Sequence, residues 1–202
     1  MSLSLELILR GEVKKLLDHF ASVMKIQTVF FSADGAILQR GRDLSNCRYC
    51  RLVQENLGGP DVCFALDRSR QREAEAVRRP VCYHCHAGLR EVMDPVFADG
   101  KNAGFIGFGQ FRTEKKPPRL TDDPTLQARL DREFMKRPYF SEDELNDLLG
   151  LFAMLMDYIV ARELVVWRGD RVWEQVRATI ESSLDRPLKL SEVARRAGRS
   201  ES

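Results

Sequence analysis

The chain has 202 residues and a net charge of +2, with 44% hydrophobic and 31% charged residues. This composition is typical of one globular domain with a small appendage, and it argues against a disordered chain. The start, MSLSLELILRGEV, lacks the basic and small-residue features of a secretory signal, and the apolar run at residues 148–167 is interrupted by Asp157, Arg162 and Glu163. We therefore expect a cytoplasmic protein without a membrane span.

Residues 3–112 are predicted to mix helix and strand. The segment LILRGEVKKLLDHFASVM repeats apolar residues at helical spacing, and IQTVFFSADGAILQR then reads as strand, turn and strand around Asp34-Gly35. Two short helices are predicted at residues 47–57 and 62–77, and several strands follow in VCYHCHAGLREVMDPVFADGKNAGFIGFGQF. Strands around central helices favour an α+β fold, in which a PAS-like antiparallel sheet carries flanking helices.

A loop and a long helix are predicted next. RTEKKPPRLTDDP is charged and proline-rich, which is typical of a loop, and SEDE at residues 141–144 matches a capping box. A helix should run from Ser141 to about Trp167. Its apolar residues cover more than one stripe, so we expect one side to pack on the preceding α+β domain and another to form a homodimer.

The last block predicts two helices with a positive surface. An amphipathic pattern follows Asp170, a loop contains Pro187, and a second helix has Ser191 as N-cap and stops at Gly198. Basic residues outnumber acidic ones here, which favours an anionic partner. The chain is thus predicted to divide into an α+β domain, a connecting and dimerisation helix and a C-terminal block, at residues 1–140, 141–168 and 169–202.

All five cysteines lie in the middle third of the chain, in CRYCRLVQENLGGPDVC and CYHCH. Because cytosolic thiols stay reduced, a disulfide framework is not expected. The pairs Cys47/Cys50 and Cys82/Cys85 have a spacing that lets two thiolates chelate one soft ion, and Cys63 is a further candidate ligand. A zinc or iron–sulfur centre, a thiol redox switch and small buried side chains are the three interpretations of these residues.

Several other polar residues are candidate site residues. His84 and His86 alternate along a predicted strand and should face one side, with one of them near the site. Gln110 is a candidate donor to a polar ligand, or it satisfies backbone at a sheet edge. The glycines of GFIGFGQF indicate close backbone approach, because no helix follows them as in a dinucleotide motif. A Cys85/His86 nucleophile is not favoured, since strand neighbours point to opposite faces, so we expect no enzyme.

Two groups of motifs in the sequence resemble known protein families. PLKLSEVARRAGRS resembles the opening of an AraC-type DNA-binding domain over about the last thirty residues. CRYCRLVQ, Cys63 with ALD, CHAGL, Asp94-Pro95 and GFIGFGQF together resemble the PocR sensory domain, over residues 6–166. The second resemblance implies a PAS-like module of a bacterial transcription regulator that binds a small organic molecule, such as a diol or a simple hydrocarbon derivative.

The resemblances also imply site residues. The PocR pattern centres on Cys50, Cys63 and Cys85, whereas Cys47 and Cys82 are additions in this chain. Together with the two other candidates, His86 and Gln110, the expected ligand-binding set is Cys50, Cys63, Cys85, His86 and Gln110. The expected DNA contacts are Arg195, Arg196, Arg199 and Ser200. Because the recognition helix would begin at about Ser200, DNA binding is expected only in the full-length protein. The alternative is a structural zinc or thiol redox module without a ligand pocket.

Overall fold

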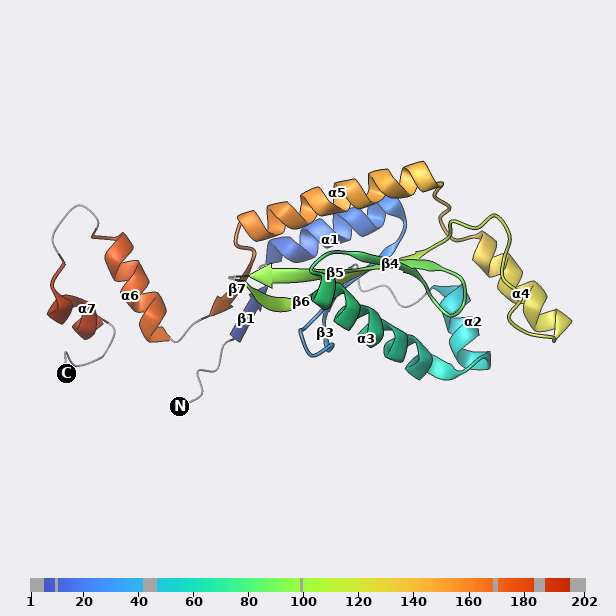
Figure 1. Ribbon diagram of the computed structural model, residues 1–202, viewed down its shortest axis with the longest axis horizontal. Coiled ribbons are helices and arrows are strands. Elements are labelled where there is room, and N and C mark those ends of the chain that lie inside the picture. Colours follow the sequence, from blue (N-terminus) through green and yellow to red (C-terminus); the bar gives the residue numbers. More distant parts are fainter. Residues whose placement is uncertain are drawn as a thin grey trace.

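The central sheet has five antiparallel strands in the order β3-β2-β6-β5-β4 (Figure 1). The structure, a computed structural model, describes residues 6–9, 11–41, 47–98, 100–168, 171–183 and 188–196. The strands of this sheet are β2 Gln27–Phe31, β3 Ile37–Arg40, β4 Val81–His84, β5 Arg90–Ala98 and β6 Lys101–Phe111. Helices flank the sheet, so the predicted α+β fold with a PAS-like antiparallel sheet is confirmed.

One face of the sheet is covered by α1 (Gly11–Met24) and α5 (Glu142–Ala161), which lie side by side in Figure 1. The buried stripes of both helices pack with strand residues into one hydrophobic core. Within it, the ring centroids of Phe108 on β6 and Phe152 on α5 are 4.4 Å apart, and Phe20 of α1 lies 5.3 Å from Phe152. As expected, one side of the long helix therefore packs on the α+β domain.

The other face of the sheet carries α2 (Arg48–Asn56) and α3 (Gly59–Val77). Both helices were predicted from the sequence, although α3 begins three residues earlier than the predicted residue 62. Gly58, with φ 119°, separates them in a left-handed conformation that favours glycine. A further helix, α4 (Pro124–Met135), packs beside α2 and was not predicted; its N-cap, Asp123, accepts the N–H of Thr125 at 2.8 Å.

The prediction that the long helix reaches Trp167 is wrong, because α5 ends at Ala161. Glu163 has a φ of 51°, which turns the chain, and β7 (Val165–Arg168) then pairs antiparallel with β1 (Glu6–Leu9). The helical pattern placed Leu9 in the first helix, but it lies in β1. A partner strand more than 150 residues away in the chain overrides the local helical pattern.

Beyond β7, α6 (Arg171–Glu181) and α7 (Leu190–Arg196) lie apart from the sheet (Figure 1). The two helices contact each other. Ser191 is not the N-cap of the second helix: α7 begins at Leu190, and the carbonyl of Lys189 accepts the N–H of Glu192 at 3.0 Å. The predicted stop at Gly198 lies outside the described residues. None of the helices within the described ranges is both long and apolar enough to cross a membrane.

Candidate functional site

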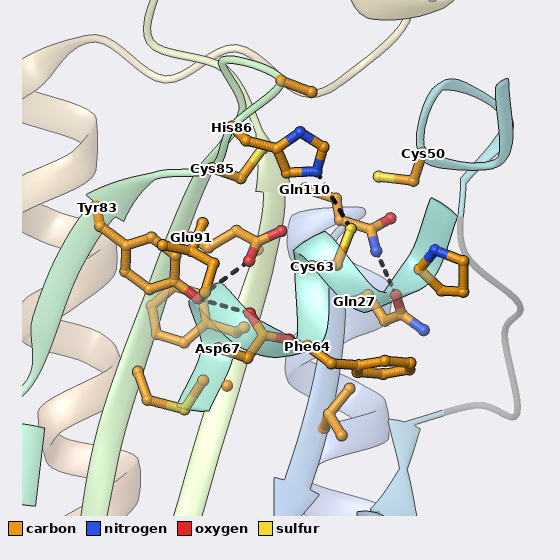
Figure 2. Close-up of a pocket in the computed structure, with 18 of the residues that line it drawn as sticks. Gln27, Cys50, Cys63, Phe64, Asp67, Tyr83, Cys85, His86, Glu91 and Gln110 are labelled. Carbon is orange, nitrogen blue, oxygen red and sulfur yellow. Dashed lines mark hydrogen bonds between the residues drawn. The ribbon is translucent and has the colours of Figure 1, made fainter. Parts of the chain in front are cut away.

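A cavity of about 140 Å³ lies between the sheet and helices α2 and α3 (Figure 2). One water needs roughly 10–15 Å³ of such space, so the cavity has room for about ten waters or one small organic molecule. Its apolar wall includes the side chains of Val29, Phe31, Phe64 and Met93. Polar and thiol groups gather elsewhere in the wall, so the cavity combines an apolar surface with hydrogen-bonding groups.

The structure brings all five predicted ligand-binding residues to this cavity. Cys50 lies on α2, Cys63 on α3 and Gln110 on β6, while Cys85 and His86 lie in the turn after β4. In Figure 2 their side chains gather at one end of the cavity. The fold thus places residues from four separate segments in one wall.

Cys63 and His86 are in direct contact. The Cys63 Sγ lies 3.3 Å from the Nε2 of His86 and accepts a hydrogen bond from the side-chain amide of Gln54 at 3.4 Å. Burial raises the pKa of the Cys63 thiol. The expectation that His84 and His86 share one face is wrong, because β4 ends at His84 and the chain turns before His86. His84 does not line the cavity, and its Nε2 instead lies 3.9 Å from the Oε1 of Glu114.

Gln110 is the extra residue of a β-bulge, opposite the junction of Arg90 and Glu91 on β5. Its φ of 65° is uncommon for a residue other than glycine. Such strained backbone conformations cluster at functional sites. The side-chain amide donates to Gln27 Oε1 at 2.6 Å and accepts the backbone N–H of Cys47 at 3.1 Å. Gln110 therefore satisfies backbone at the start of α2 while it also lines the cavity.

Three further polar residues of the cavity were missed by the sequence analysis. Tyr83 Oη lies 3.2 Å from Asp67 Oδ1 and 3.1 Å from Glu91 Oε2, as the dashed lines in Figure 2 show. Burial and the charge of Asp67 raise the pKa of Glu91 to about 8, and burial raises that of Asp67 to about 6. The signal in the sequence that could have indicated Glu91 was its charge within the largely apolar strand β5. Gly109 on β6 lies opposite Glu91, and a Cβ added at Gly109 would lie 2.6 Å from Glu91 Cγ.

The glycines of β6 permit close contacts with neighbouring strands, as expected. At Gly104, whose φ is 135°, an added Cβ would lie 2.1 Å from the carbonyl oxygen of Phe31. At Gly107 it would lie 3.1 Å from the ring of Phe31. These positions keep the sheet closely packed beneath the cavity.

The five predicted metal ligands do not form one group. Cys82 packs with the core under α1 and α5, on the face of the sheet opposite the cavity, since strand neighbours alternate between faces. Its assignment to one centre with Cys50, Cys63 and Cys85 is therefore wrong. Cys47 caps α2, where its Sγ accepts the N–H of Cys50 at 3.5 Å. Within the described part of the chain, no three His, Cys, Asp or Glu side chains are grouped to hold a metal ion.

Of the residues expected to contact DNA, two lie within the described residues. Arg195 and Arg196 are exposed in the last turn of α7, and the Nη2 of Arg196 lies 3.6 Å from the Oε1 of Glu192. Arg199 and Ser200 lie outside the described residues. The exposed arginines leave this end of α7 positively charged.

Comparison with known proteins gives a family. A family model described as a sensory domain found in PocR matches residues 6–164. Among solved structures, HmgR of Pseudomonas aeruginosa is 15% identical, with a TM-score of 0.27, and the match covers 62% of this chain and 65% of that chain. A search of curated proteins finds no match. Since the family match extends from β1 to the end of α5 and includes every residue of the cavity wall, this chain belongs to the family of PocR sensory domains.

Proposed function

We propose that this chain is the ligand-sensing region of a bacterial transcription regulator, and that the cavity binds a small organic molecule. The observation that carries the proposal is the convergence of Cys50, Cys63, Cys85, His86 and Gln110 on one cavity within a sensory domain. The cavity volume fits a molecule such as a diol or a simple hydrocarbon derivative. An apolar wall would hold the hydrocarbon part, and the polar groups would orient a substituent.

Signal transmission would run through β5, which faces the cavity on one side and α5 on the other. Met93 lines the cavity, whereas the next residue, Asp94, is buried on the helix-covered face. A ligand that prefers one position of β5 would change how α5 packs. In the proposed regulator this change passes through β7 to α6 and α7, where Arg195 and Arg196 would contact phosphates in an AraC-type output domain.

Ligand binding is tested by the thermal stability of the chain with a panel of small diols, alcohols, aldehydes and amines. A binder stabilises the folded state by mass action. Val29→Phe fills part of the cavity and should abolish the stabilisation, whereas Leu38→Phe on the neighbouring strand should not, because Leu38 is 46% exposed and outside the cavity wall. Stabilisation that persists in Val29→Phe would show that the ligand binds elsewhere.

A thiol redox module is a second candidate function. The pair Cys47 and Cys50 at the N-terminus of α2 favours it. A hydrogen bond from the Cys50 thiol lowers the pKa of Cys47, while the same contact raises that of Cys50. Oxidation by hydrogen peroxide would join the two sulfurs, with the two thiol protons and two electrons reducing the peroxide to two waters. Mass spectrometry after peroxide treatment should show a Cys47–Cys50 disulfide; reduced thiols after treatment would rule the candidate out.

A further inference from the structure

Two carboxyl groups in the cavity share one hydroxyl. Asp67 on α3 and Glu91 on β5 both lie within hydrogen-bond distance of the Tyr83 Oη. A tyrosine hydroxyl has one proton and can donate to one of them at a time. The second contact therefore needs another proton, or it leaves a carboxylate beside an oxygen with nothing to donate. With both carboxyl groups ionised, the cluster lacks one proton or one positive charge.

The pKa values agree with this geometry. Burial raises the pKa of Glu91 to about 8 and that of Asp67 to about 6, and the charge of Asp67 is the second cause of the shift of Glu91. At pH 7 the pair thus holds about one proton and one negative charge. A bound cation would reverse this preference, because it stabilises both carboxylates at once.

The neighbouring charged and titratable groups do not supply that cation. Arg40 and His86 also line the cavity, and the Arg70 guanidinium lies over the Tyr83 ring at 5.5 Å from its centroid. Among the described residues, however, no ion pair joins a basic side chain to Asp67 or Glu91. The remaining titratable groups near Glu91 are the thiols of Cys47, Cys50, Cys63 and Cys85, none of which brings a positive charge.

The rest of the wall suits the body of an alkyl cation. The aromatic side chains of Phe31 and Phe64 line the same cavity as the carboxyl groups. Aromatic faces attract cations and also bury hydrocarbon. An ammonium offers three N–H donors, enough for both carboxylates and one further acceptor. A neutral alcohol offers one donor and does not compensate the charge.

We propose that the cavity selects a small organic amine, whose ammonium group binds between Asp67 and Glu91 beside Tyr83 and whose carbon chain packs on the aromatic wall. This inference rests on the proposed function, since it names the ligand class of the same cavity. Binding releases the proton shared by the carboxyl pair. The amine keeps its own proton, because an alkyl ammonium remains charged at neutral pH.

The test is calorimetric titration with a matched pair of probes, 1-aminopropan-2-ol and propane-1,2-diol, which differ in one amino group. The full chain is titrated at pH 7 in phosphate and in MOPS, whose ionisation enthalpies differ. We expect the amine to bind about tenfold tighter or more, as a charge-assisted hydrogen bond predicts. The difference between the buffers should correspond to release of about one proton, and affinity for the amine should rise from pH 6 to pH 7.

Variants assign the effect to the carboxyl pair. Glu91→Gln should remove the preference for the amine over the diol, and it should also remove the proton release. Glu75→Gln on the exposed side of α3 is the matched control and should change neither. If Glu91→Gln does not fold, Asp67→Asn tests the same pair, and the proton count of the unmodified chain needs no variant.

The outcomes separate this inference from the proposed function. Equal or tighter binding of the diol, or amine binding without proton release, overturns the amine inference while the cavity remains a small-molecule site. Binding of neither probe also overturns it, and the wider panel with Val29→Phe then decides whether the cavity binds any small molecule.

Discussion

The pH dependence of stability should change when Asp94 is replaced by asparagine. Asp94 is 6% exposed and lies on the face of β5 that α5 covers. Burial, with the charge of Asp157 on α5 as a second cause, raises the pKa of Asp94 from 3.8 to about 7. The folded protein therefore binds a proton at this residue between about pH 4 and pH 7 that the unfolded chain has released.

This difference in bound protons between the folded and unfolded chain sets how strongly stability depends on pH. Because the folded state binds more protons, stability falls as pH rises through this window, by about 1.4 kcal/mol per pH unit for one proton. From pH 5 to pH 7 the loss is ~2.3 kcal/mol, because Asp94 is already half ionised at pH 7. Asparagine has nearly the same shape and does not ionise, so Asp94→Asn should lack this contribution. The raised pKa values of Asp67 and Glu91 are common to both proteins and cancel in the comparison.

Urea unfolding at pH 5, 6 and 7 measures the effect. The free energy of unfolding of Asp94→Asn, relative to the unmodified chain, should increase by about 2–3 kcal/mol from pH 5 to pH 7. Asp122→Asn is the control, because the side chain of Asp122 is 96% exposed and its pair with Arg119 lies at the surface. A difference between Asp94→Asn and the unmodified chain that does not vary with pH would refute the reasoning.

Three further predictions concern metal, assembly and DNA. If thiols hold zinc or iron, elemental analysis of anaerobically purified protein should find the metal in the unmodified chain and in Cys82→Ser, because Cys82 lies on the other face of the sheet, but not in Cys50→Ser. Unmodified protein without metal would contradict the metal prediction. α5 exposes 70% of Met154, so sedimentation should show a dimer that Met154→Lys converts to monomer, and a monomer at micromolar concentration before substitution would count against it. DNA binding through Arg195 and Arg196 should be weak, salt-dependent and equal for promoter and scrambled duplexes; a clear preference for the promoter would be the opposite result.

Much of the fold could be predicted because its signals are local. The turn at Asp34-Gly35 and the capping box of α5 each occupy a few residues, and the structure has Gly35 at φ 85° and reciprocal hydrogen bonds between Ser141 and Glu144. The pairing of β1 with β7 could not be predicted in this way. It depends on two segments from opposite ends of the domain, and each is a weak strand signal by itself.

The cavity was predicted in part. The resemblance to a family indicated Cys50, Cys63 and Cys85, but spacing alone suggested that Cys82 would join them. Spacing along a chain does not tell which face of a sheet a residue occupies when the end of the strand is unknown. The carboxyl pair was missed because Asp67 and Glu91 belong to different elements, and only the packing of α3 on β5 brings them to one hydroxyl.

Ligand binding in the cavity is tested most directly by amide NMR spectra of the chain titrated with a binder from the panel. Gly107 and Gly109 lie in the cavity wall, whereas Gly150 lies on α5 on the opposite side of the sheet. We predict that the amide signals of Gly107 and Gly109 shift in proportion to occupancy, and that Val29→Phe abolishes these shifts. Ligand-induced shifts that spare both glycines, or that survive in Val29→Phe, would contradict a sensor whose ligand site is this cavity.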